Sequence, residues 1–153
     1  MKIQLKTIII LSVIALLYSC GGNEEKKIDG NAERDALEKS LTLSLEANKL
    51  TQSPNDEMTF DLPETTEKEI VAKLEQSVKI GSKINDKFLE WLHEGLQNEF
   101  KDHFVRGNAL YLEGLKTDNV QKQIEGNKLI MQWNGYWNNN SKAILGKMYP
   151  EEN

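Results

Sequence analysis

The chain has 153 residues with a formal net charge of −5, and 28% of its residues are charged, which suits one domain with a hydrophobic core. An acidic chain of this kind lacks the basic surface that nucleic acid requires, so nucleic acid is excluded as a partner. Its single cysteine, Cys20, excludes disulfides within the chain and zinc sites built from several cysteines.

The first element is a short apolar segment with a basic start. Lys2 and Lys6 open an apolar run that extends from Thr7 to Leu17, and Cys20 follows three residues later. The run is shorter than the roughly 20 apolar residues that a membrane-spanning helix needs. A charged start, a short apolar stretch and a small residue before a cut are typical of a secretory signal peptide.

Leu17-Tyr18-Ser19-Cys20 resembles the lipobox of bacterial lipoproteins. The resemblance implies that the chain is cut before Cys20, that its thiol carries diacylglycerol, and that its new amino group is acylated. Residues 1–19 are then a signal peptide. Because the cut removes Lys2 and Lys6, the 134 residues that remain of the 153 carry 17 basic and 24 acidic side chains, a net charge of −7.

Residues 20–30 form the expected tether, since a polar, charged, Gly-containing stretch cannot bury enough apolar area to order itself. The residue after Cys20 is Gly21, not the Asp that, by resemblance to enterobacterial sorting, favours the inner membrane. Glu24-Glu25 resembles the surface-export signals of Bacteroidota lipoproteins, without the usual preceding Lys. We expect lipid anchoring in the cell envelope, at the outer membrane, with the periplasmic and surface faces both open.

Residues 31–153 are predicted to form an all-α domain, an antiparallel bundle of three to four helices. Residues 64–149 contain no proline, and their apolar residues recur at spacings of three and four. The first helix is expected at about 32–50, with a buried stripe. That stripe consists of Leu37, Leu41 and Leu45.

Residues 51–65 are predicted to be a connector, because Ser53-Pro54-Asn55-Asp56 is typical of a turn. Thr66 is expected to start the second helix, with Glu69 completing a capping box. We expect a kink at Gly81-Ser82 and a break near Gly95.

The third helix is expected at about 96–116 and the fourth at about 119–137, capped by Asp118 with Gln121 three residues later. Asn138-Asn139-Asn140 is expected to interrupt the fourth helix, and Ser141 to cap a last short turn.

Val105-Arg106-Gly107-Asn108-Ala109-Leu110 is similar to Ile124-Glu125-Gly126-Asn127-Lys128-Leu129. If the two helices form a hairpin, the numbers of facing residues sum to about 235, so Asn108 faces Asn127 and the glycines lie at matching heights. Glycine inside a helix costs about 1 kcal/mol relative to alanine. The pair therefore predicts a close helix crossing with Asn108 bonded to Asn127, or, as the alternative, a small polar ligand pocket.

Glu90 and His93 have the Glu-x-x-His spacing of carboxylate-bridged di-iron bundles, but the second copy that such a site needs is missing. Glu99 and His103, four residues apart on one helical face, could supply two further ligands. Charged helix faces produce such spacings by chance, so we expect neither a metal nor another cofactor.

An aromatic cluster is expected near the end of the fourth helix, facing residues of the third helix. The cluster consists of Trp133, Tyr136 and Trp137, opposite Phe100, His103 and Glu99. Such a cluster is either a core with its polar ring atoms at the rim or the wall of a ligand pocket or partner surface.

The sequence contains no nucleophile elbow and no Gly-rich phosphate loop, so it gives no basis for an enzymatic activity. We expect a lipid-anchored envelope protein that binds another protein or acts as an accessory subunit. One alternative is a lipoprotein that binds a small ligand or a metal at the aromatic and histidine cluster. Another is an inhibitor or immunity-type lipoprotein, whose acidity suits a basic target.

Overall fold

The computed structural model describes residues 30–51 and 63–150, and within these ranges all regular structure is helical. The prediction of an all-α fold is therefore confirmed. The predicted signal peptide, Cys20 and most of the predicted connector lie outside the described residues. Within the described ranges, no helix is both long enough and apolar enough to cross a membrane.

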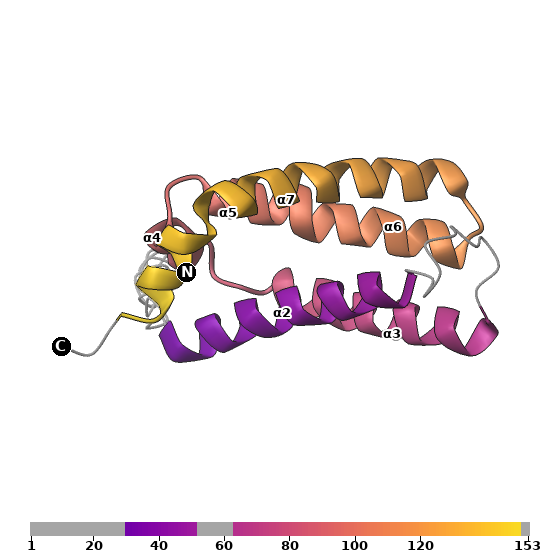
Figure 1. The fold of residues 1–153 in the computed structure, drawn as a ribbon, viewed down its shortest axis with the longest axis horizontal. Coiled ribbons are helices and arrows are strands. Elements are labelled where there is room, and N and C mark those ends of the chain that lie inside the picture. The colour runs from indigo at the N-terminus through magenta and orange to yellow at the C-terminus, as the bar shows by residue number, and fades with distance from the viewer. Residues whose placement is uncertain (1–29, 52–62, 151–153) are drawn as a thin grey trace, which may run out of the picture.

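Two antiparallel helix pairs lie against each other along the long axis of the molecule (Figure 1). One pair is α2 with α3, the other is α6 with α7, and α3 also packs on α6. Short helices link the pairs at one end. The helices are α2 (Gly30–Thr51), α3 (Glu64–Gly81), α4 (Asp86–Leu92), α5 (Leu96–Asn98), the π-helix η1 (Glu99–Val105), α6 (Arg106–Lys116) and α7 (Val120–Met148).

The break predicted near Gly95 is confirmed. Helix α4 ends at Leu92, His93 has an extended backbone, and Gly95 has a φ of 77°, a left-handed conformation that glycine adopts without strain. From Leu96 to Lys116 the chain is helical throughout, as predicted for the third helix. The π-helical turns inside it were not predicted.

Two predicted helix starts are wrong. Helix α3 begins at Glu64 after Pro63, whose carbonyl accepts the N–H groups of Thr66 and Glu67, so Thr66 lies inside the helix and forms no capping box. Pro63 is the N-cap residue and has the extended ψ of 139° that is usual at this position. Helix α7 is capped by Asn119, whose side chain accepts the Lys122 N–H, and not by Asp118.

The interruption predicted at Asn138-Asn139-Asn140 is also wrong, because α7 continues to Met148. Asn140 donates a 2.9 Å hydrogen bond to the Tyr136 carbonyl within its own helix. Ile144 and Met148 are buried in the core beyond it. Tertiary packing therefore stabilises the helix through three residues of weak helix propensity.

The buried face of α2 differs from the predicted stripe. Leu37 is buried, but Leu41 is half-buried and Leu45 is 55% exposed. The remaining buried residues of α2 are Ser40, Ser44 and Ala47. These small side chains allow α2 to approach α3 closely, so the larger leucines are displaced to the flank of the contact.

Reciprocal hydrogen bonds join α2 to α3. The Ser40 hydroxyl donates to the Ser77 carbonyl at 2.9 Å, and the Ser77 hydroxyl donates to the Ser40 carbonyl at 2.7 Å. A Cβ on Gly81 would lie 2.8 Å from the Ser40 hydroxyl oxygen. The contact thus requires small residues on both helices.

Helices α6 and α7 approach each other closely at Gly107 and Gly126. A Cβ on Gly126 would lie 2.5 Å from the Tyr111 nitrogen, and a Cβ on Gly107 would lie 3.1 Å from the Gly126 carbonyl oxygen. The proximity of Gly107 to Gly126, and of Tyr111 to Gly126, agrees with a hairpin register near 235. The bond expected between Asn108 and Asn127 is absent, because Asn127 is exposed and Asn108 points elsewhere.

Asn108 belongs to a buried polar layer that consists of Ser40, Ser44, Ser77 and Asn108. Its amide oxygen accepts the Ser44 hydroxyl at 2.8 Å, and its amide nitrogen donates to the Phe104 carbonyl at 2.8 Å. The bond between Ser44 and Asn108 ties α2 of one pair to α6 of the other. Among the described residues, no buried side-chain polar atom lacks a hydrogen-bond partner.

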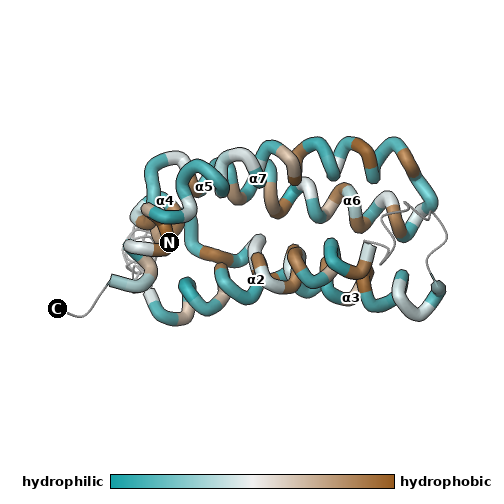
Figure 2. Tube along the Cα trace, viewed as in Figure 1, coloured by the Kyte–Doolittle hydropathy of each residue, from teal (hydrophilic) through white to brown (hydrophobic). Residues whose placement is uncertain are grey.

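The polar layer separates two apolar clusters, and apolar positions recur between polar ones along the long helices (Figure 2). The larger cluster includes Leu37, Phe100 and Trp133, and the smaller one includes Leu74 and Leu112. Burial of these side chains supplies the main stabilisation of a fold of this kind.

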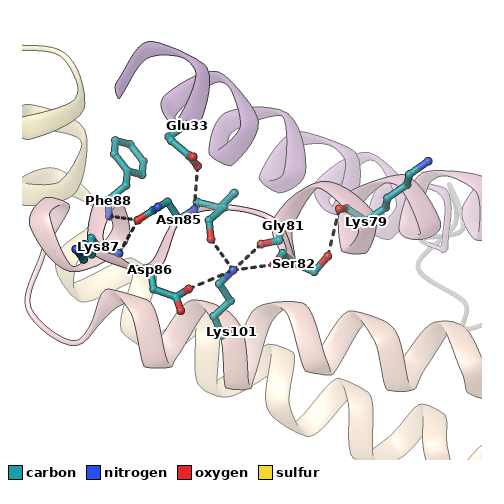
Figure 3. A network of polar contacts seen from close by, with 10 residues as sticks. Glu33, Lys79, Gly81, Ser82, Asn85, Asp86, Lys87, Phe88 and Lys101 are labelled. Atoms are coloured by element: carbon teal, nitrogen blue, oxygen red, sulfur yellow. Dashed lines mark hydrogen bonds and ion pairs between the residues drawn. The ribbon is translucent and has the colours of Figure 1, made fainter. Parts of the chain in front are cut away.

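Lys101 fixes the turn between α3 and α4 (Figure 3). Its ammonium donates to the carbonyl oxygens of Gly81, Ser82 and Ile84 at 3.2, 3.0 and 2.7 Å, and lies 3.5 Å from the Asp86 carboxylate. A cation is favourable at a helix C-terminus, where carbonyl groups lack helical partners. The expected kink at Gly81-Ser82 is therefore the end of a helix.

We predict opposite effects for the same substitution at two glycines of α7. Gly126→Ala should lower the free energy of unfolding by about 1–3 kcal/mol, because its Cβ would meet backbone atoms of α6 that cannot move independently. Gly135→Ala should raise it by about 1 kcal/mol, because no atom lies within 4 Å of that Cβ and alanine favours helix. Denaturant unfolding measures both, and an unchanged or raised free energy of unfolding in Gly126→Ala would contradict the close crossing.

Candidate functional site

The predicted aromatic cluster is a row of packed rings that runs from the core to the surface. Phe100 and Phe104 stack within η1, with ring centroids 5.0 Å apart. Trp133 of α7 packs edge-on against Phe100 at 5.6 Å and lies 5.4 Å from Trp137. Phe100 and Trp133 are buried, whereas Tyr136 and Trp137 are half-buried. The row is therefore core at one end and surface at the other.

Glu99 and His103 are on η1, the helix that carries Phe100 and Phe104. Their side chains form a 2.7 Å pair, one turn apart on η1, and both are half-buried. Neither residue lines the groove described below. The structure thus brings together Trp133 and Trp137, and it places Glu99 near enough to Tyr136 for its charge to act on the tyrosine hydroxyl.

Tyr136 lies among titratable groups at the surface. Its hydroxyl lies 2.8 Å from the His93 ring nitrogen Nδ1 and 3.2 Å from the Glu94 carbonyl oxygen. Burial, followed by the negative charges of Glu99 and Glu90, raises the pKa of Tyr136 above its ordinary value of 10.0. The tyrosine therefore holds its proton more firmly than an exposed one.

The residues considered as metal ligands have other roles. Glu90 accepts the Gly95 N–H at the start of α5, and His93 bonds Tyr136. His103 is paired with Glu99 on η1, a different helix from the one that carries Glu90. Across residues 30–51 and 63–150, no group of three or more His, Cys, Asp or Glu side chains is placed to hold a metal ion.

A groove of about 280 Å³ lies between α2 and α7, and we call it the α2–α7 groove. Phe104, Ile130 and Trp133 are its buried hydrophobic residues, and Leu45 and Trp137 contribute more exposed surface. The other lining residues are Leu41, Thr42, Ser44, Asn48 and Asn134.

None of the ten residues that line the α2–α7 groove carries a charge. The surrounding surface is different. The hollow between α2 and α3 is bordered by Glu33, Lys79 and Lys83. The hollow between α3 and α6 is bordered by acidic and basic residues that include Glu75 and Lys116. In a chain with 28% charged residues, a charge-free concave surface with an aromatic floor is suited to apolar contacts.

The sequence reasoning missed the half of the groove that α2 supplies. Leu41 and Leu45 were assigned to the core because they continue the four-residue spacing from Leu37. The overlooked signal is the second row of small residues, Ser40 and Ser44, which marks the true contact face of the helix.

Comparison of the chain with protein-family models, with curated proteins and with solved structures gives no match. The function of this chain is therefore inferred from its own residues and their geometry.

We predict that Tyr136→Phe weakens the loss of stability at alkaline pH. Below the ordinary tyrosine pKa the side chain is protonated in both states. As the pH rises above that value, the unfolded chain releases its proton first, so the free energy of unfolding falls until the higher pKa of folded Tyr136 is passed. Denaturant unfolding from about pH 8 to about pH 11 should show a smaller fall in the variant. Parallel curves would contradict the raised pKa.

Proposed function

We propose that this chain is a lipid-anchored helical protein of the cell envelope that binds another protein, as an accessory subunit or as an inhibitor. The lipobox-like Leu17-Tyr18-Ser19-Cys20 supports the anchor, and the polar stretch after it supports a tether that allows the helical domain to reach a partner. The outer membrane is the proposed location, on its periplasmic or surface face.

The observation that carries protein binding is the charge-free α2–α7 groove. The centres of protein–protein interfaces are depleted in charged residues and enriched in aromatic ones, and they are surrounded by a polar rim. The groove has two tryptophans and a phenylalanine, and its outer positions include Thr42, Asn48 and Asn134. Leu45, a large aliphatic side chain, is 55% exposed at its edge.

A small apolar ligand is the alternative occupant, because Trp133 and Trp137 line the groove. Pockets for drug-sized ligands usually measure about 300–1,000 Å³ and bury most of the ligand. The α2–α7 groove, at about 280 Å³, lies just below that range. Its size therefore favours a few side chains of a partner protein over a separate ligand.

We predict that Cys20→Ser abolishes membrane attachment. A serine hydroxyl cannot replace the thiol that accepts the lipid, so the variant should carry no acyl chains and should keep its first 19 residues. Mass spectrometry of the N-terminal peptide and fractionation of membranes measure both effects, with Gly21→Ser as a control that keeps the thiol. Unmodified Cys20 in the wild-type protein would contradict the anchor.

We predict that Leu45→Glu removes the partner, because a carboxylate at the groove edge opposes burial of apolar side chains. Cross-linking in cells, followed by purification of the tagged full chain from membranes, should recover a stoichiometric protein with the wild type. Ile124→Glu is the matched control, since Ile124 is 57% exposed and does not line the groove.

The partner should remain with Ile124→Glu and be lost with Leu45→Glu. Equal recovery with both variants would place binding elsewhere on the molecule. A wild-type chain that is recovered at high yield without any partner would contradict protein binding itself.

A further inference from the structure

We infer that one end of the helical domain lies on the surface of a phospholipid bilayer, with Trp91 and Tyr149 in the interfacial layer and with Arg34 and Lys147 beside the lipid phosphates. This contact goes beyond protein binding, and it rests on one part of the proposed function, the lipid anchor at Cys20.

Three parts of the chain that are far apart in sequence meet at this end. The beginning of α2, the short helix α4 and the end of α7 lie together at one end of the long axis (Figure 1). They border a hollow of about 210 Å³. Its lining includes Gly30 and Arg34 of α2, Trp91 of α4 and Lys147 of α7. We call these four residues, with Tyr149, the Trp91 surface.

Two large aromatic side chains of the Trp91 surface are exposed. Trp91 is 54% exposed, whereas Phe88, whose ring centroid is 6.0 Å away on the same helix, is buried. Tyr149 directly follows α7 and is 47% exposed. Trp and Tyr are enriched where a bilayer meets water, because the ring is buried against apolar groups while its polar atom stays hydrated. The two rings are therefore of the kind that an interfacial contact uses.

A cation accompanies each ring. The Lys147 ammonium lies 5.0 Å from the Trp91 ring centroid, and the Arg34 guanidinium carbon lies 5.3 Å from the Tyr149 ring centroid. Each cation also donates to a backbone carbonyl, Lys147 to that of Trp91 and Arg34 to that of Met148 at 3.1 Å. Because Lys has three donors and Arg five, both keep donors for a phosphate group. Long basic side chains beside apolar rings suit the headgroup layer.

The charge at this end indicates a zwitterionic lipid. The lining of the hollow carries Arg34 and Lys147 and no acidic residue. Next to it, however, Asp35 lies 4.0 Å from Arg34, and Glu38 accepts the Tyr149 hydroxyl at 2.9 Å. These carboxylates offset the two cations, so the end lacks the cluster of basic residues that anionic lipid attracts. A headgroup with one phosphate and one ammonium group complements both signs.

The position of the expected anchor favours this end of the molecule over the other. Gly30 lines the hollow, and Cys20 precedes it by ten residues. Ten residues span at most about 36 Å, so Gly30 stays within that distance of the acylated residue. The other end of α2, at Thr51, is about 33 Å farther along the helix. A weak contact close to an anchor is populated, because the anchor raises the effective concentration of the bilayer.

The test uses the full chain, purified from the membranes of the cells that produce it and reconstituted in phosphatidylcholine vesicles with bromine on the acyl chains near the glycerol. Bromine quenches the fluorescence of a tryptophan that comes close to it. Compared with bromine-free vesicles, the wild type should lose the emission of Trp91, and Trp91→Phe should show no loss. Trp137→Phe, the same substitution in the α2–α7 groove, should keep the loss, since Trp137 is ten residues, or about 15 Å, before Lys147 on α7.

A second pair of variants keeps the Trp91 probe and changes the surface. Tyr149→Ser should reduce the quenching of Trp91, because it removes one of the two interfacial rings. Ile124→Ser is the matched control, since Ile124 is 57% exposed near the opposite end of α7 and should leave the quenching unchanged. Equal quenching in both variants would contradict a contact made by the Trp91 surface.

Mass spectrometry of the N-terminal peptide in the same preparation separates this inference from the proposed anchor. Quenching that depends on Trp137 and not on Trp91 overturns the inference and places the α2–α7 groove against the bilayer. A lipid on Cys20 without quenching overturns the inference and leaves the anchor intact. Quenching that depends on Trp91 without a lipid on Cys20 supports the contact and overturns the anchor. The absence of both overturns both.

Discussion

The close contact of α6 and α7 at Gly126 determines where the α2–α7 groove is formed. No Cβ fits between the two backbones there, because the Tyr111 nitrogen and the Gly107 carbonyl oxygen occupy its place. The contact fixes the register of the hairpin, since a shift along the helix would bring a side chain into that space. In this register Trp133 packs against Phe100 and Phe104, and its indole becomes part of the groove.

The other side of the groove depends on a different kind of contact. Ser40 and Ser77 bring α2 close to α3, and Ser44 bonds Asn108 across to α6. Buried polar groups of this kind favour one arrangement, because any shift leaves a buried donor or acceptor without a partner. With these three serines facing inward, Leu41 and Leu45 of α2 lie on its flank. The groove beside α7 is therefore a consequence of how α2 packs against the other helices.

The groove and the charged surface around it suit different tasks. Charged side chains at i and i+4, such as Glu64 with Lys68, keep the outer faces of the helices solvated and contribute little to stability. The groove instead offers apolar area that a partner can bury, which is the main source of binding free energy in protein complexes. A membrane anchor would strengthen weak binding at such a surface, because confining both proteins to the same membrane raises their effective concentration.

The sequence by itself determined the all-α class, the break near Gly95, the helical run from Leu96 to Lys116 and the register of the α6–α7 hairpin. These features follow from local conformational preferences and from helical spacing, which neighbouring residues encode. The partner of Asn108, the course of α7 through its three consecutive asparagines and the exposure of Leu45 were decided by the tertiary structure. Each depends on which helix lies opposite, and Ser44 and Asn108 are 64 positions apart in the chain. No local pattern specifies which distant side chain completes such a contact, because burial and hydrogen bonding are settled only when all the helices pack together.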